Sequence, residues 1–160
     1  MLFPDKEHIE CYEIGEFLVK KLGISDWKML FSGHGLEGRD THGLEAHATK
    51  VAFHRACHGR ALGLTDEQEI LVRSLPGVEV VEFAQADQCC GFGGAFSATH
   101  GKLSSGIGSE KLKNVIDSGA ELLVSGDMGC LMHLQGLIDK SNQPLKTKHY
   151  LQLLAEAIPE

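Results

Sequence analysis

The chain has 160 residues, the size of one ordinary domain, which can bury a full core without needing disulfides or a metal to stay folded. It carries 15 Lys and Arg against 22 Asp and Glu, a net charge of -7 at pH 7 with no basic run, so nucleic acid is not an expected partner. No stretch approaches the ~20 apolar residues of a membrane span, and the start of the chain lacks the features of a signal peptide, so we expect a cytoplasmic, reducing location.

The first 50 residues predict a helix followed by a loop. Residues 9–22 carry five apolar side chains on one helical stripe that we expect to dock on the rest of the fold: Ile9, Ile14, Phe17, Leu18 and Leu22. Residues 31–50 are rich in Gly and His and have no sustained period, which predicts a loop or extended linker. Its histidines, His34, His42 and His47, are expected to be solvated.

From residue 51 onward the sequence alternates between strand and helix patterns. The predicted strands are residues 50–54, 78–83, 120–127 and 144–150. The predicted helices are residues 65–75, capped by Thr65 with Gln68 three residues on, 108–119, 129–140 and 150–158. This alternation predicts an α/β fold, a Rossmann-like parallel sheet of about four strands with crossover helices. We therefore divide the chain into an N-terminal part, 1–50, and an α/β domain, 51–160.

The five cysteines are an odd number in a chain without an export signal, which favours metal or redox chemistry over a disulfide framework. Four of them follow the carboxyl end of a predicted strand: Cys57, Cys89, Cys90 and Cys130. Those ends share one edge of a parallel sheet, where open α/β folds bind ligands, so we expect the four thiols to converge in one crevice. Cys11 stands apart and is expected to be a small apolar residue on the N-terminal helix.

Converging thiols suit an iron-sulfur cluster, a zinc ion or a redox pair at Cys89 and Cys90. The "GFGG" turn that follows favours the cluster, because a bare backbone lets N–H groups approach its sulfurs. Cys130 is predicted at a helix N-terminus, where the helix dipole lowers the pKa of a thiol. The glycines expected to contact the cofactor are Gly91, Gly93, Gly94 and Gly129.

Three histidines near the cysteines have two interpretations each. His133 follows Cys130 by three residues and shares its helical face, so it is either a ligand or proton carrier or a hydrogen-bonded polar residue. His54 and His58, which flank Cys57, have the same alternatives. A dinucleotide-binding loop is disfavoured, because Phe96 replaces the third glycine of that fingerprint.

The spacing of Cys57, the Cys89-Cys90-Gly91 triplet and the "GCLMH" stretch around Cys130 resembles the CCG or cysteine-rich domain. That domain occurs in heterodisulfide reductase, in the iron-sulfur subunit of glycolate oxidase and in the lactate-utilisation iron-sulfur proteins. "PGVEVVEFAQADQCCGFGGAFS" and "KLKNVIDSGAELLVSGDMGCLMHLQG" are most similar to the lactate-utilisation and glycolate-oxidase branch. The resemblance covers the chain from about residue 11 to the C-terminus.

The resemblance implies an electron-transfer domain with a [4Fe-4S]-type cluster on Cys57, Cys89, Cys90 and Cys130. It also implies a redox subunit, without catalytic residues of its own, that works with flavin or iron-sulfur subunits of a lactate or glycolate oxidation complex. Such partners could hold it at the inner face of the membrane. A zinc-binding assembly module and a thiol-disulfide domain are the alternatives.

The chain departs from the family pattern in three places. His133 stands where the heterodisulfide reductase pattern has a further cysteine, and Arg55-Ala56 replaces the usual Asp-Pro pair. One CCG domain is present where the family usually has two.

Overall fold

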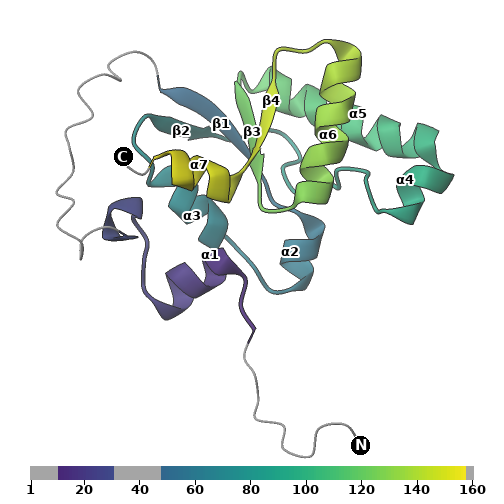
Figure 1. The fold of residues 1–160 in the computed structure, drawn as a ribbon. Helices are drawn as coiled ribbons and strands as arrows, with labels where there is room; N and C mark the ends of the chain where they lie inside the picture. The colour runs from purple at the N-terminus through teal and green to yellow at the C-terminus, as the bar shows by residue number, and fades with distance from the viewer. Residues whose placement is uncertain (1–10, 31–47, 158–160) are drawn as a thin grey trace, which may run out of the picture.

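The computed structural model describes residues 11–30 and 48–157, in which a parallel sheet is covered by helices on both faces (Figure 1). The strands are β1 (Thr49–His54), β2 (Val78–Val81), β3 (Leu122–Ser125) and β4 (Lys146–His149). The α-helices are α1 (Ile14–Glu16), α2 (Cys57–Ala61), α3 (Glu67–Arg73), α4 (Ala95–Thr99), α5 (Gly101–Asp117), α6 (Met128–Ser141) and α7 (Tyr150–Glu156). A π-helical turn, η1 (Phe17–Lys21), extends α1, and a 3-10 turn, η2 (Trp27–Leu30), follows it. The predicted α/β fold is confirmed.

The four strands lie in the order β2-β1-β3-β4, and every neighbouring pair is parallel. After β1 the chain moves to one side to form β2, then crosses β1 to form β3 and continues outward to β4. The direction of winding therefore reverses between β1 and β3. This reversal is the topological switch point at whose carboxyl edge open α/β sheets bind ligands.

β1 is buried on both faces because successive side chains point to opposite sides of the sheet. Val51 and Phe53 belong to the core formed with α3 and α7, and Ala52 belongs to the core formed with α5 and α6. His54 continues the alternation on the side of Ala52. The last residue of the strand therefore directs a polar side chain toward α5 and α6.

The N-terminal helix is present, but only part of the docking face expected for it is correct. Leu18 packs on the core as predicted, together with Val19, whereas Ile14, Phe17 and Leu22 are 52%, 43% and 54% exposed. The expected stripe assumed a 3.6-residue period throughout, whereas the wider π turn of η1 changes the facing of the residues after it. Ile9 and the histidines of residues 31–47 lie outside the described residues.

Gly15 and Tyr150 fix the position of this helix. The buried Gly15 N–H donates to the Tyr150 hydroxyl at 3.0 Å, and that hydroxyl donates to Glu13 at 2.5 Å. The helix thus approaches α3 and α7 through a glycine rather than through its bulky apolar residues. Cys11, expected on the helix as an apolar residue, is exposed and precedes it.

Two predicted helix starts are also wrong. Asp66, not Thr65, is the N-cap of α3, because the Thr65 hydroxyl and N–H both bond the Glu67 carboxylate. α5 begins at Gly101 rather than at residue 108. Its first turns are rich in Gly and Ser, which have low helix propensity, but Ser104 and Gly108 are buried there by tertiary packing.

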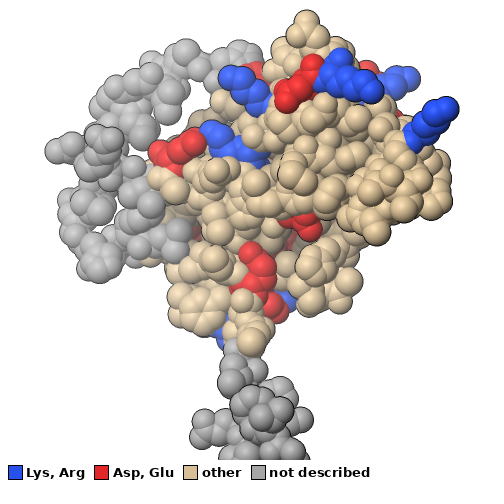
Figure 2. Space-filling view, turned by 45° about the vertical axis from the view of Figure 1, so that its right-hand side comes forward, with Lys and Arg blue, Asp and Glu red and all other residues tan. Residues whose placement is uncertain are grey.

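The face in Figure 2 is covered mainly by uncharged side chains, with Lys and Arg gathered along its upper part. Among the described residues, no helix combines the length and the apolar character needed to cross a membrane.

Candidate metal centre

The candidate site lies at the carboxyl ends of β1 and β3, where the strand order reverses. β1 ends at His54, which pairs in register with Ser125 at the end of β3. The Ser125 hydroxyl donates to the His54 carbonyl oxygen at 2.9 Å and accepts from the Asp127 N–H at 3.2 Å. These bonds hold the two strand ends together and direct the chain into α6.

Cys130 is positioned by the first turn of α6. Asp127 is the N-cap residue, and its carboxylate accepts a hydrogen bond from the Cys130 backbone N–H at 2.9 Å. The cap satisfies one of the free N–H groups of the helix start. The predicted place of Cys130 at a helix N-terminus is therefore confirmed, and its side chain is 5% exposed.

Cys90 reaches the same point from the loop between β2 and α4. The next residue, Gly91, has φ +89°, and a Cβ there would lie 2.5 Å from the Ser104 carbonyl oxygen, so only glycine fits. The Gly91 N–H donates to the Cys89 sulfur at 3.3 Å, and the Phe92 N–H donates to the Cys90 sulfur at 3.5 Å. Donors directed at sulfur favour the thiolate form that binds metal.

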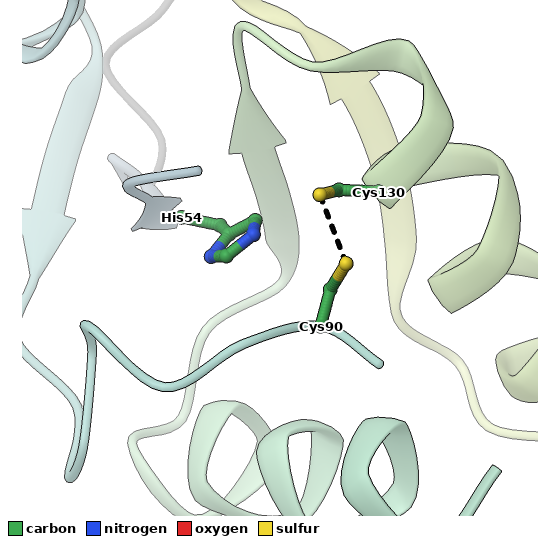
Figure 3. Close-up of side chains that lie close together, drawn as sticks. All are labelled: His54, Cys90 and Cys130. Carbon is green, nitrogen blue, oxygen red and sulfur yellow. Dashed lines mark hydrogen bonds between the residues drawn. The ribbon is translucent and has the colours of Figure 1, made fainter. Parts of the chain in front are cut away.

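His54, Cys90 and Cys130 form a buried group, which we call the His/Cys/Cys group (Figure 3). One ligand atom from each residue lies within 4.8 Å of the other two. The two sulfurs are 2.9 Å apart and hydrogen-bonded, and both cysteines are free. The group brings one imidazole and two thiols from three separate segments into one place.

The two thiols have opposite pKa shifts. The hydrogen bond with Cys130 outweighs burial and lowers the pKa of Cys90 to about 4. The same hydrogen bond, together with burial, raises the pKa of Cys130. One thiol of the pair therefore loses its proton more easily than an ordinary thiol, and the other less easily. A lowered pKa favours the thiolate form, which is the form that binds metal.

Burial lowers the pKa of His54, so its ring is neutral at neutral pH. The nearby Cys90 thiolate opposes this shift, which indicates that its sulfur lies beside the ring. Within the described part of the chain, neither ring nitrogen has a partner with hydrogen-bond geometry. A buried polar atom left unpaired costs about 1–3 kcal/mol, so a native fold rarely keeps one without a use for it.

Lys111 of α5 places a buried cation near the thiols. Its side chain is 0% exposed, and its ammonium donates to the carbonyl oxygens of Ala86 and Gln88 at 2.9 Å each. Burial lowers the pKa of Lys111 to about 8, and the negative charge of Cys90 opposes that shift. The ammonium also lies 5.1 Å from the centre of the Phe83 ring. Lys111 thereby holds the loop that leads to Cys89 and Cys90 and adds positive charge beside it.

Lys111 and the packing role of Phe92 were not predicted from the sequence. Lys111 lies on the buried face of α5 with Ser104, Gly108 and Val115, a helical spacing that could have identified it. The Phe92 ring covers Gly129, where a Cβ would lie 2.9 Å from a ring carbon. The turn that was expected to be bare therefore places one aromatic ring over the start of α6.

Cys57 and Cys89, the other predicted ligands, lie outside the His/Cys/Cys group and are exposed. Cys57 is the first residue of α2, and its charge contributes to the raised pKa of Cys130, so it lies within electrostatic range. Cys89 is adjacent to Cys90 in the same turn. The structure thus buries two of the four predicted thiols and leaves two at the surface nearby.

The three histidines considered as possible ligands also fall partly inside and partly outside the His/Cys/Cys group. His133 is outside the His/Cys/Cys group; its ring centre is 6.0 Å from that of Phe92, and its Nε2 faces Gly108. His58 is exposed, and its Nδ1 lies 3.8 Å from a carboxylate oxygen of Asp127. Of the three histidines that the sequence offered, only His54 joins the two buried thiols.

The predicted glycines shape the turn by their backbone conformation. Gly93 and Gly94 have φ values of +54° and +53°, in the region that favours glycine. Both are exposed, whereas Gly91 is buried against α5.

The donor set suits a metal centre. Around a tetrahedral zinc ion with Zn–S of about 2.3 Å and Zn–N of about 2.0 Å, neighbouring ligand atoms lie roughly 3.5–3.8 Å apart. The ligand atoms of the His/Cys/Cys group all lie within 4.8 Å of one another, which is compatible with such spacings. The 2.9 Å sulfur separation is shorter, so a shared metal would require side-chain rotations that part the sulfurs by about 1 Å. Thiolates are also the usual ligands of iron-sulfur clusters, with histidine as an occasional replacement.

A cavity of about 180 Å³ lies nearby, between α2, α3 and the end of β3. Its buried carboxylates are already paired, Glu67 with Lys20 at 2.7 Å and Glu69 with Arg55 at 2.6 Å. These ion pairs fix α3 against the N-terminal helix and the end of β1.

The family model for the cysteine-rich domain, CCG, matches residues 51–135. This chain belongs to the CCG family. The matched CCG segment begins in β1 and ends in α6, so it contains every residue of the His/Cys/Cys group. The family membership expected from the cysteine pattern is confirmed.

Curated relatives of this CCG chain carry lactate-utilisation names. Lactate utilization protein A of Oceanobacillus iheyensis is 35% identical over 146 residues, 91% of this chain and 53% of that protein. Lactate utilization protein A 2 of Bacillus cereus is 32% identical over 148 residues, 92% of this chain and 54% of that protein. Lactate utilization protein A 1 of Bacillus anthracis has the same identity and coverage. The chain spans about half the length of the curated relatives it matches.

Proposed function

We propose that this chain is an iron-sulfur-binding electron-transfer domain of a lactate or glycolate oxidation complex. The observation that carries the proposal is the His/Cys/Cys group, buried at the topological switch point, where the hydrogen bond with Cys130 lowers the pKa of Cys90. The names of the relatives, lactate utilization protein A, support the link to lactate oxidation.

The cluster ligands in this proposal are Cys57, Cys89, Cys90 and Cys130. Cys90 and Cys130 supply the buried side of the site, and the exposed Cys57 and Cys89 close it from the surface. When bound, an iron-sulfur cluster supplies one-electron transfer. The protein's part is to bury the site and to direct the Phe92 N–H and neighbouring donors at the sulfurs, which tunes the potential.

The electron-transfer role requires a partner. The chain carries no motif for a two-electron organic cofactor, so lactate or glycolate oxidation would take place on a flavin or iron-sulfur subunit of the complex. We place the CCG unit at residues 51–160, preceded by an N-terminal segment, 1–50. A cytoplasmic location, with attachment to the inner face of the membrane through partners, fits such a complex.

Anaerobic reconstitution with iron and sulfide tests the proposal. The wild-type protein should acquire visible sulfur-to-iron charge-transfer absorbance, together with stoichiometric iron and sulfide. Cys90→Ser should lose most of it, whereas Cys11→Ser, which changes an exposed cysteine outside the site, should retain it. Wild-type protein that stays colourless with all its thiols reduced would sink the proposal.

Zinc is the second candidate, because one imidazole and two thiolates are also common ligands of a zinc site. Protein purified anaerobically would then contain stoichiometric zinc and neither iron nor sulfide. In that case the domain would serve in structure or assembly rather than in electron transfer.

A further inference from the structure

His54 is a buried side chain beside the two buried thiols. It is 1% exposed at the end of β1, and its ring points toward Cys90 and Cys130 (Figure 3). Both ring nitrogens lack a partner with hydrogen-bond geometry within the described residues. Strand alternation forces this orientation, because Val51 and Phe53 occupy the opposite face of β1.

The surroundings of the ring suit coordination. A buried ring nitrogen needs a hydrogen-bond partner or a metal, and the groups that the site brings beside this ring are the thiols of Cys90 and Cys130. The ligand atom of His54 lies within 4.8 Å of both sulfurs, so a single metal can reach all three residues.

His133, the histidine that the sequence pattern favours, is less well placed. It is in the second turn of α6, where its Nε2 faces Gly108 and its ring lies beside Phe92. It does not belong to the His/Cys/Cys group. The histidine beside the two thiols is therefore not His133, three residues after Cys130 in sequence. It is His54, which lies 76 positions before Cys130 at the end of β1.

We propose that His54 is a metal ligand of this centre, coordinating through a ring nitrogen together with Cys90 and Cys130. The type of metal centre in this inference rests on the proposed function, whereas coordination by His54 does not depend on it. If His54 takes the place of one of the two exposed thiolates of the proposed cluster, Cys57 or Cys89, the centre becomes less negative, which favours its reduced form and raises its potential.

Cobalt binding tests the ligand without requiring a cluster. Reduced, metal-free protein titrated anaerobically with Co²⁺ should develop thiolate-to-cobalt charge-transfer bands and the ligand-field bands of tetrahedral cobalt. Loss of an outer-shell partner weakens metal binding about 10–100-fold, and His54→Ala should weaken it by more than that. His133→Ala, the matched control, should bind Co²⁺ as the wild type does. His54→Cys should restore binding with stronger charge-transfer bands, which guards against a loss caused by misfolding.

Pulsed electron paramagnetic resonance of the reconstituted, reduced cluster gives a second readout. Protein labelled with ¹⁵N-histidine should show one strongly coupled nitrogen, absent in His54→Cys and present in His133→Ala. A cluster without a strongly coupled nitrogen, or a His54→Ala protein that binds Co²⁺ within about tenfold of wild type, would overturn the inference. A cluster that forms but lacks that coupling would overturn the inference about His54 and leave the proposed function standing. Co²⁺ binding that depends on His54, in a protein that assembles no cluster, would support His54 as a ligand and overturn the proposed function.

Discussion

Cys90 and Cys130 place their sulfurs 2.9 Å apart, although 40 positions separate them in the sequence. Cys90 comes from a glycine-rich turn after β2, and Cys130 comes from the first turn of a helix after β3. Their contact exists because the chain crosses β1 between the two strands and brings both loops to the same edge of the sheet. The hydrogen bond between them, in a buried place, lowers the pKa of Cys90.

The first prediction concerns that thiolate. Because the hydrogen bond with Cys130 lowers the pKa of Cys90 to about 4, metal-free protein should retain about one thiolate from pH 8 down to pH 5. Ultraviolet thiolate absorbance measures it during an anaerobic titration. Cys90→Ser should abolish this thiolate, and Cys130→Ser should shift its titration to higher pH. A wild-type thiolate signal that disappears below pH 8, as for ordinary thiols, would contradict the lowered pKa of Cys90.

The second prediction concerns the pH dependence of folding stability. Burial lowers the pKa of Lys111 from 10.5 to about 8 in the folded state, so between these values the unfolded chain binds more protons. The contribution of Lys111 to the free energy of unfolding should therefore rise with pH from 8 to 10.5.

Lys111→Met removes that contribution and provides the reference. Urea unfolding of both proteins at pH 7.5 and pH 9.5 should show the stability difference moving in favour of the wild type at the higher pH. A difference that does not change with pH would mean that Lys111 is not buried as a cation.

The third prediction concerns Gly91. An alanine at this position would have φ +89° and a Cβ 2.5 Å from the Ser104 carbonyl oxygen, so Gly91→Ala should lower the free energy of unfolding by about 2 kcal/mol or more. Gly106→Ala is the control, because its Cβ meets no atom within 4 Å in the middle of α5 and should be neutral or stabilising. Equal effects of the two changes in a denaturant titration would refute the close approach.

The fourth prediction concerns the cap of α6. Asp127→Ala removes the carboxylate that accepts from the Cys130 N–H and should cost about 1 kcal/mol of stability. It should also weaken Co²⁺ binding, because the turn that carries Cys130 is less firmly held. Asp127→Asn keeps a capping oxygen and should recover most of both losses. If Asp127→Ala changes neither unfolding nor Co²⁺ binding, the cap does not position Cys130.

Much of the fold was predictable from local patterns. The strand at β1 is a short apolar run, and the start of α6 is marked by the "GDMGC" stretch, so each could be identified from its own residues. The N-terminal helix and the start of α5 were misjudged because their contacts are tertiary: Gly15 under Tyr150, and Gly108 against Leu137. Helix propensity and periodicity contain no information about such contacts.

The sequence by itself determined the family, the parallel α/β architecture and the expectation that thiols would gather at the carboxyl edge, because strand ends and cysteine spacing can both be counted along the chain. Only the tertiary structure decided which side chains meet inside. It turned His54 inward and His133 toward Phe92, left Cys57 and Cys89 at the surface, and buried Lys111 beside the thiols. The physical reason is that a side chain's direction depends on strand alternation and helix packing, which join residues far apart in the chain.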